Sequence, residues 1–413
     1  MANRLLGALR ANSKNKLFER SQTAVSYSTG FLPFDFRNGY IVEVQDIDGN
    51  HMMEYPAIGL TGGSFVTIIG KSGTAKTTFA IQAASNIVRP FKNGTIIHFD
   101  LEQATNYTRI RNVTNMGQRE MYEKYVLRQE KISIEKITTT LNEIVTEKTT
   151  NRKEYEYDTG LFNEFGQPII ALAPTVCILD SIPSITTDDQ SMEIEGGTYA
   201  NRIAKANSQF YKKMVSQIKA ANIIFISINH INAKIEINPM SKTAPQLLHM
   251  KMDESLPGGN APIYYAQNIL KFVSRGAEKR TIKDNGFDGF GVDCMLLKSR
   301  SNKAGQMVKL VFDQQRGFDS FLTLYEYAND HGLIIGKNPR RRITGAEDVE
   351  FDSREFDKII NDPALRERLE DALTKGCLPL MQRELSTGSN VPHSGELDAV
   401  TLLRILDSQD NEF

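Results

Sequence analysis

Eight consecutive residues, Gly70-Lys-Ser-Gly-Thr-Ala-Lys-Thr77, match a phosphate-binding glycine loop (P-loop) at every position but one. In such a loop, backbone N–H groups and the positive end of the following helix surround the phosphates. Lys76 is expected to reach the β- and γ-phosphates of a nucleotide, and the Thr77 hydroxyl to bind Mg²⁺. Ala75 is the exception, because the pattern has glycine there and a Cβ restricts the backbone. The predicted nucleotide-binding residues of this segment are Gly70, Lys71, Ser72, Gly73, Thr74, Ala75, Lys76, Thr77 and Thr78.

The residues on both sides of this segment provide the structural context that a P-loop needs. An apolar run, SFVTIIG, precedes the loop at 64–70, and KTTFAIQAASNIV follows it with helical composition at 76–88. A glycine-containing turn with an incidental Lys-Thr pair is the alternative reading. The P-loop requires a strand before it and a helix after it, and both are predicted here. The sequence therefore favours a nucleotide site.

Two carboxylates follow other apolar runs. Asp180 ends VCILD, and a carboxylate at that point can hold the water shell of Mg²⁺. Glu102 lies two residues beyond TIIHFD and can orient or deprotonate an attacking water. A turn or helix-capping role for Asp180 and an exposed loop position for Glu102 are the alternatives. Because the sequence also contains a P-loop, Asp180 and Thr77 are predicted to hold Mg²⁺, partly through water.

The elements that must position these residues form a simple pattern. Four apolar runs, at 64–70, 95–100, 175–180 and 222–229, each end in glycine or a polar residue, and a helical repeat of apolar residues lies between the last two. Strands of this kind that alternate with helices predict a parallel sheet covered on both faces. Ligands of such sheets bind outside the carboxyl ends of the strands, so the four ends are expected to converge. Residues 292–297 and 307–312 predict an added antiparallel pair.

The amino-acid composition limits the class of protein to which this chain can belong. The 413 residues are 40% apolar and 24% charged, with a formal net charge of −1. No run of 18 apolar residues occurs, so no membrane span is expected. Cys177, Cys294 and Cys377 are far apart, which suits free thiols and predicts a cytoplasmic location. A basic excess between 271 and 310, nine Lys or Arg against four Asp or Glu, suits either phosphate groups or a solvated surface.

Taken in order, the segments FDLEQ, ILDS, ISINH, PGGNAPIYYA and LLKSR follow the P-loop. This order resembles the RecA family of homologous-recombination ATPases, its phage members in particular, over about residues 55–335. The resemblance implies an α/β fold with a RecA-type P-loop core: a mostly parallel twisted sheet with helices on both faces and antiparallel strands at one edge. It also implies an oligomerisation segment (1–55), the ATPase core (56–337) and a small helical C-terminal domain with a disordered tail (338–413). Residues 338–345 are expected to be a basic linker.

Carried over by position, the resemblance implies further roles. Glu102 resembles the water-activating glutamate, and His230 stands where the family has a γ-phosphate sensor. Lys298 and Arg300 resemble a cationic pair that reaches the ATP of a neighbouring subunit, although a solvated strand edge would also contain them. Tyr107 is a candidate for stacking on adenine. Segments 184–199 and 232–259 resemble two DNA-binding loops.

The function implied is an ATP- and Mg²⁺-dependent DNA recombinase. It would form helical filaments on single-stranded DNA and pair it with homologous duplex DNA, with mediator and single-strand-binding proteins as further partners. A hexameric helicase with the same core remains an alternative, since it would form closed rings. A second alternative is a P-loop scaffold that binds DNA without hydrolysing ATP. Ala75 is the feature that supports this alternative, because it departs from the P-loop pattern.

Overall fold

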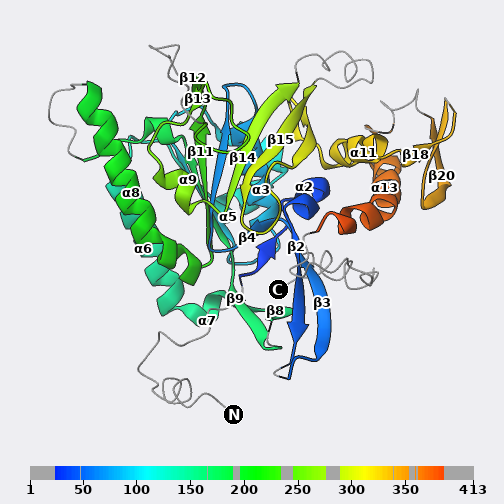
Figure 1. Cartoon of the computed structure of the whole chain (residues 1–413), viewed down its shortest axis with the longest axis horizontal. Helices are drawn as coiled ribbons and strands as arrows, with labels where there is room; N and C mark the ends of the chain where they lie inside the picture. Colours follow the sequence, from blue (N-terminus) through cyan, green and yellow to red (C-terminus); the bar gives the residue numbers. More distant parts are fainter. Residues whose placement is uncertain are drawn as a thin grey trace.

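The computed structural model describes residues 24–46, 48–164, 166–188, 196–233, 245–275, 289–337, 339–352, 359 and 361–385, with side chains in the helix that starts at 196 described from residue 201 onward. A nine-stranded sheet forms its centre (Figure 1). From one edge to the other the strands are β17 (Gly317–Phe318), β16 (Met307–Asp313), β15 (Gly289–Ser299), β14 (Asn268–Arg275), β5 (Phe65–Gly70), β11 (Ile223–His230), β10 (Thr175–Asp180), β6 (Thr95–Asp100) and β7 (Tyr125–Arg128).

The direction of the strands changes once across this sheet. The strands from β14 to β7 are parallel, whereas β15, β16 and β17 continue the other edge in antiparallel pairs. Strand β5 pairs with β11 on one side and with β14 on the other, so the connections diverge beside it. This is a topological switch point, where parallel sheets bind their ligands. The predicted α/β core of the RecA type, with antiparallel strands at one edge, is confirmed.

Helices cover both faces of the sheet, as Figure 1 shows. On one face, α3 (Lys76–Val88) and α4 (Tyr107–Thr114) pack against apolar side chains of β5, β6 and β10. On the other face, α6 (Ile134–Thr150) and α8 (Gly196–Ala220) bury a second cluster, which includes Phe210, Met214 and Ile218 of the predicted helical repeat. Burial on both faces explains why the central strands are apolar throughout.

Smaller elements connect these layers. The remaining helices among the described residues are α2 (Leu32–Arg37), α5 (Gln118–Lys124), α7 (Arg152–Tyr155), a 3₁₀ turn at Ile182–Ser184, α9 (Ala261–Tyr265), α11 (Ser320–Asp330) and α13 (Pro363–Arg383). Two hairpins project together from the lower side in Figure 1: β2 (Tyr40–Gln45) with β3 (His51–Ala57), and β8 (Glu156–Phe162) with β9 (Pro168–Leu172). Their apolar side chains share a small cluster. Two short strand pairs complete these elements: β1 (Ser26–Tyr27) with β4 (Leu60–Thr61), and β12 (Asn232–Ala233) with β13 (Glu254–Ser255).

None of the described helices is long and apolar enough to cross a membrane.

The C-terminal segment differs from the expected linker and helices. Residues 338–345 are not simply a linker, because Arg340–Ile343 forms strand β19 between β18 (Ile334–Ile335) and β20 (Ala346–Asp352). This sheet and α13 share one apolar cluster with Phe36 of α2 and Val311 of β16. Packing against distant residues stabilises a strand whose own sequence, RRRI, gives no strand pattern. The described part of the N-terminal region contains α2, β2 and β3.

Candidate nucleotide-binding site

The P-loop joins β5 to α3, as its sequence predicts. Gly70 ends the strand where the chain lies against β14, since a Cβ there would come within 2.6 Å of the Phe272 carbonyl oxygen. Ala75 precedes the first helical residue with φ 61° and ψ 24°, a left-handed conformation. Glycine adopts this conformation at little cost, and alanine does so with strain. The loop therefore keeps the backbone path that its pattern assigns to glycine, with alanine in that position.

Lys76 lies inside the loop. Its buried ammonium donates hydrogen bonds to the carbonyl oxygens of Gly70, at 3.0 Å, and Lys71, at 2.7 Å. Burial lowers the pKa of Lys76, against the opposing effect of the Asp180 and Glu102 charges. An ammonium held by neutral carbonyls in a buried loop can exchange them for phosphate oxygens, which pair with its charge.

Thr77 and Asp180 form the oxygen pair expected of a Mg²⁺ site. The Thr77 hydroxyl donates to Asp180 Oδ2 at 2.6 Å, although the two residues are 103 positions apart. Burial, together with the nearby charges of Glu102 and Asp100, raises the pKa of Asp180 to about 6, against the lowering effect of the Thr77 hydrogen bond and the Lys76 charge. A hydroxyl and a carboxylate are ligands that Mg²⁺ prefers, so these residues fit the ion.

Asp100 is a carboxylate that sequence reasoning missed as a site residue. It is fully buried at the end of β6 and lies opposite Asp180 in the sheet register. It accepts hydrogen bonds from the backbone N–H of Thr105, at 2.9 Å, and from the side chain of Gln129, also at 2.9 Å. Potential ligand atoms of His98, Asp100 and Asp180 lie within 4.8 Å of one another. Asp100 ended a predicted strand, and this was the signal that could have identified it.

Glu102 lies between the ends of two other strands. Its Oε1 accepts a hydrogen bond from Ser181 Oγ at 2.5 Å and contacts His230 Nε2 at 3.0 Å. Burial raises the pKa of Glu102, but hydrogen bonds from Ser181 and His230 and the charges of His230 and Lys76 together lower it below its ordinary value. His230 itself lies beside Gly70 in the sheet register. The structure thus brings Glu102 and His230 together next to the P-loop, and it adds Ser181.

Lys298 and Arg300 lie together at the end of β15. Lys298 Nζ donates to the carbonyl oxygens of Ile263, at 2.7 Å, and Tyr264, at 3.0 Å, and the Arg300 guanidinium donates to Tyr264 at 2.8 Å. These carbonyls belong to the last turn of α9, where positive charge is favoured. Burial, followed by the charge of Arg300, lowers the pKa of Lys298 to about 8. Within one subunit the pair therefore caps α9, and its role across an interface stays a prediction.

Tyr107 is the first residue of α4, with 51% of its surface exposed. The neighbouring Arg109 was not expected in the site. Its guanidinium donates to the carbonyl oxygens of Gln314, at 2.7 Å, and Gln315, at 2.9 Å, and so fastens α4 to the turn between β16 and β17. The stacking role of Tyr107 stays a prediction.

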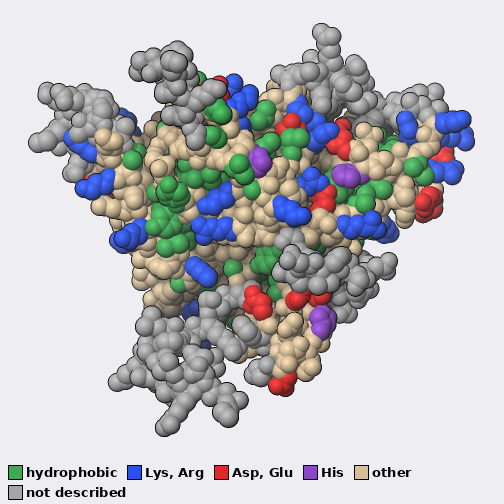
Figure 2. Space-filling view, viewed as in Figure 1, with side chains coloured by type: hydrophobic (Ala, Val, Ile, Leu, Met, Phe, Trp, Pro, Cys, Tyr) green, Lys and Arg blue, Asp and Glu red, His purple; other side chains and the backbone are tan. Residues whose placement is uncertain are grey.

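The two predicted DNA loops are described only in part. The first is described at 184–188 and from 196, where α8 has already begun; the second is described at 232–233 and 245–259. Lys234, Met240 and Lys242 lie outside the described residues. Glu254, in the second of these segments, pairs with Lys271 of β14 at 2.6 Å. On the face shown in Figure 2, the described Lys and Arg side chains lie among apolar, acidic and uncharged ones.

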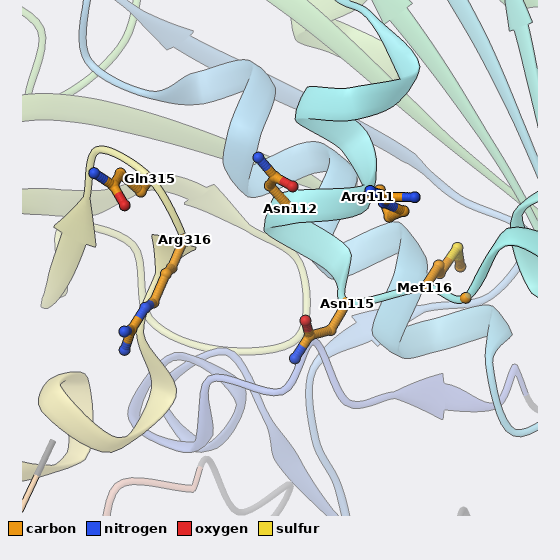
Figure 3. Close-up of a pocket in the computed structure, with 7 residues that line it drawn as sticks. Arg111, Asn112, Asn115, Met116, Gln315 and Arg316 are labelled. Atoms are coloured by element: carbon orange, nitrogen blue, oxygen red, sulfur yellow. The ribbon is translucent and has the colours of Figure 1, made fainter. Parts of the chain in front are cut away.

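A polar hollow of about 410 Å³ lies away from the P-loop, between the end of α4 and the β16–β17 turn. Figure 3 shows its labelled residues: Arg111, Asn112, Asn115, Met116, Gln315 and Arg316. The side chains of Arg111 and Arg316 extend in different directions there and do not converge on one point. The hollow therefore lacks a pair of cations aimed at a shared anion.

The fold and the loop together define a P-loop protein with an α/β core of the RecA type. Neither the protein-family models nor the curated proteins searched contain a match to this chain. Among solved structures it is similar to the crystal structure of the RadB recombinase, with 16% sequence identity and a TM-score of 0.38 over 63% of this chain and 92% of that chain. Functional assignment therefore depends on the geometry of the site.

Proposed function

We propose that this chain is an ATP-hydrolysing DNA recombinase of the kind represented by the phage protein UvsX. One observation carries the proposal: the separate segments behind the RecA resemblance meet at one edge of the sheet. Glu102 of FDLEQ contacts Ser181 of ILDS and His230 of ISINH. The Asn229 side chain donates to the Pro257 carbonyl of PGGN at 2.9 Å. Lys298 and Arg300 of LLKSR in turn donate hydrogen bonds to the carbonyl oxygens of Ile263 and Tyr264 in α9.

In this proposal the P-loop binds the triphosphate of ATP. Lys76 contacts the β- and γ-phosphates, while Thr77 and Asp180 hold Mg²⁺, which would neutralise charge that develops on the phosphates. Glu102 is the group that orients and deprotonates the attacking water. His230, next to both Glu102 and Gly70, is placed to respond to the γ-phosphate. Tyr107 is proposed to stack on the adenine.

DNA is proposed to bind at the two loops that follow Asp180 and His230, and filaments to form when the Lys298–Arg300 pair reaches the nucleotide of a neighbouring subunit. That step requires the pair to exchange carbonyls of α9 for phosphate oxygens, a stronger partner for a cation. Strand exchange with homologous duplex DNA, partnership with mediator and single-strand-binding proteins, and a cytoplasmic location remain predictions of the same proposal.

The ATPase rate with and without single-stranded DNA tests the proposal. We expect hydrolysis that DNA stimulates, and filaments that follow the length of the DNA in electron microscopy. Closed rings with DNA-stimulated hydrolysis would favour the helicase. DNA binding without any hydrolysis would favour the scaffold, the alternative to which the alanine at position 75 points.

A further inference from the structure

The Oε1 oxygen of Glu102 accepts hydrogen bonds from the ends of two different strands. Ser181 follows β10 and donates at 2.5 Å; His230 ends β11 and lies at 3.0 Å through Nε2. We refer to these two contacts as the Glu102 latch. The two residues are 79 and 128 positions from Glu102 along the chain, so only the folded sheet brings them to the same oxygen.

Each donor also lies two or three residues before a predicted DNA loop. Ser181 directly precedes the 3₁₀ turn Ile182–Ser184, which leads into the first loop. His230 is followed by Ile231 and the short strand β12 at the start of the second loop. A displacement of either loop stem therefore moves a donor away from Glu102.

Burial makes the Ser181 contact well defined. Ser181 is 0% exposed, and besides Glu102 its hydroxyl has the more distant Ser184 Oγ, at 3.5 Å, as a described neighbour. The Glu102 side chain is 35% exposed and the His230 side chain 30%. A buried hydroxyl without another close partner holds its acceptor in one place, whereas the half-exposed carboxylate could otherwise take several rotamers.

The latch also changes the chemistry of Glu102. A carboxylate oxygen that accepts hydrogen bonds from Ser181 and His230 is a weaker proton acceptor, because its lone pairs are already engaged. General-base catalysis becomes less effective as the base weakens. Removing a donor frees Oε1 to receive a proton from water.

We propose that Ser181 and His230 restrain Glu102 in a resting position, and that DNA bound at either loop releases it. The inference rests on the proposed function, because it takes Glu102 as the base and the two loops as the DNA site. Ser181 is a positioning residue in this scheme and touches neither nucleotide nor DNA. Hydrolysis would then stay slow until DNA moves the loop stems.

The test is the ATPase rate without DNA in Ser181→Ala. We expect this rate to rise about 10-fold, since loss of a hydrogen bond to a charged group shifts an equilibrium by roughly that factor. The KM for ATP should be unchanged, and stimulation by DNA should fall by the same factor. A merely structural role for Ser181 would instead lower the rates with and without DNA together.

A matched control is Ser85→Ala, which also removes a fully buried serine hydroxyl, one with no hydrogen-bond partner among the described residues. Ser85 lies in the second half of α3, away from the latch, and its loss should leave the rate without DNA unchanged. Adding Glu102→Gln to Ser181→Ala should abolish the increase, because the increase depends on the released carboxylate.

The outcomes separate the two proposals. If DNA stimulates the wild-type protein but Ser181→Ala is no faster without DNA, the latch is wrong and the recombinase proposal stands. If DNA has no effect on the wild type, the recombinase proposal fails. In that case a faster Ser181→Ala, returned to the wild-type rate or below by Glu102→Gln, still supports restraint of Glu102 by Ser181, and an unchanged rate overturns it.

Discussion

Asp180→Asn should stabilise the protein at neutral and alkaline pH while it abolishes hydrolysis. Burial raises the pKa of Asp180 from 3.8 to about 6, so the ionised carboxylate is unfavourable in the folded chain. A shift of about two pKa units corresponds to about 3 kcal/mol of unfolding free energy at pH 8. Asparagine removes the charge, and its side-chain oxygen can still accept the hydrogen bond from Thr77.

The sign of the pH dependence follows from the protons bound. Between pH 4 and 6 the folded wild type binds more protons at Asp180 than the unfolded chain does, so its stability rises as the pH falls through this window. The advantage of Asp180→Asn should therefore be complete above pH 6, fall to about half at pH 5, and vanish below the ordinary pKa of 3.8.

Urea unfolding of both proteins at pH 8 and pH 5, without nucleotide or Mg²⁺, measures this difference. Asp46→Asn is the control with the opposite sign, because hydrogen bonds from Asn50 lower the pKa of that exposed carboxyl. The Asp46→Asn substitution should not increase the free energy of unfolding at pH 8. A stability difference for Asp180→Asn that is independent of pH, or a loss of stability at pH 8, would refute burial as the cause of the raised pKa.

The remaining predictions concern nucleotide and DNA. Lys76→Ala removes a charge-assisted contact and should lower ATP turnover at least about 100-fold, whereas Lys92→Ala at an exposed position should stay within a few-fold of wild type; equal rates in a steady-state assay would contradict the P-loop role. ATP analogue should tighten binding of a labelled single-stranded oligonucleotide relative to ADP, by linkage, and equal affinities would contradict the coupling. The double variant Lys298→Ala with Arg300→Ala should bind nucleotide but hydrolyse it poorly, and mixing it with Lys76→Ala on DNA should restore part of the activity. Mixed filaments that remain inactive would contradict a role in trans.

Much of the central fold was predictable because its signals are local. The apolar runs that end at Gly70, Asp100 and Asp180 are strands, and the antiparallel pair near the end of the core is present as β15 and β16. Strands buried on both faces must be apolar throughout, and this requirement is visible in single segments of sequence. The P-loop was predictable for the same reason, since its strand, loop and helix are contiguous.

Other elements escaped prediction because distant residues stabilise them. Strand β19 has the sequence RRRI, and its pairing with β18 and β20 and the burial of Ile343 in the C-terminal cluster make it a strand. Arg109 lies in a helix whose pattern shows nothing unusual, yet it fastens that helix to a turn 205 positions away. Neither contact leaves a periodic signal in the sequence.

The sequence by itself determined the P-loop, the strands that end beside it and the identity of Lys76, Thr77, Asp180 and Glu102 as candidates. Only the tertiary structure decided which of them touch. It set the Thr77 hydroxyl on Asp180, and it placed Ser181 on the same oxygen of Glu102 as His230. The physical reason is that residue types and spacing follow from local backbone geometry, whereas a hydrogen bond of about 3 Å depends on the register of neighbouring strands.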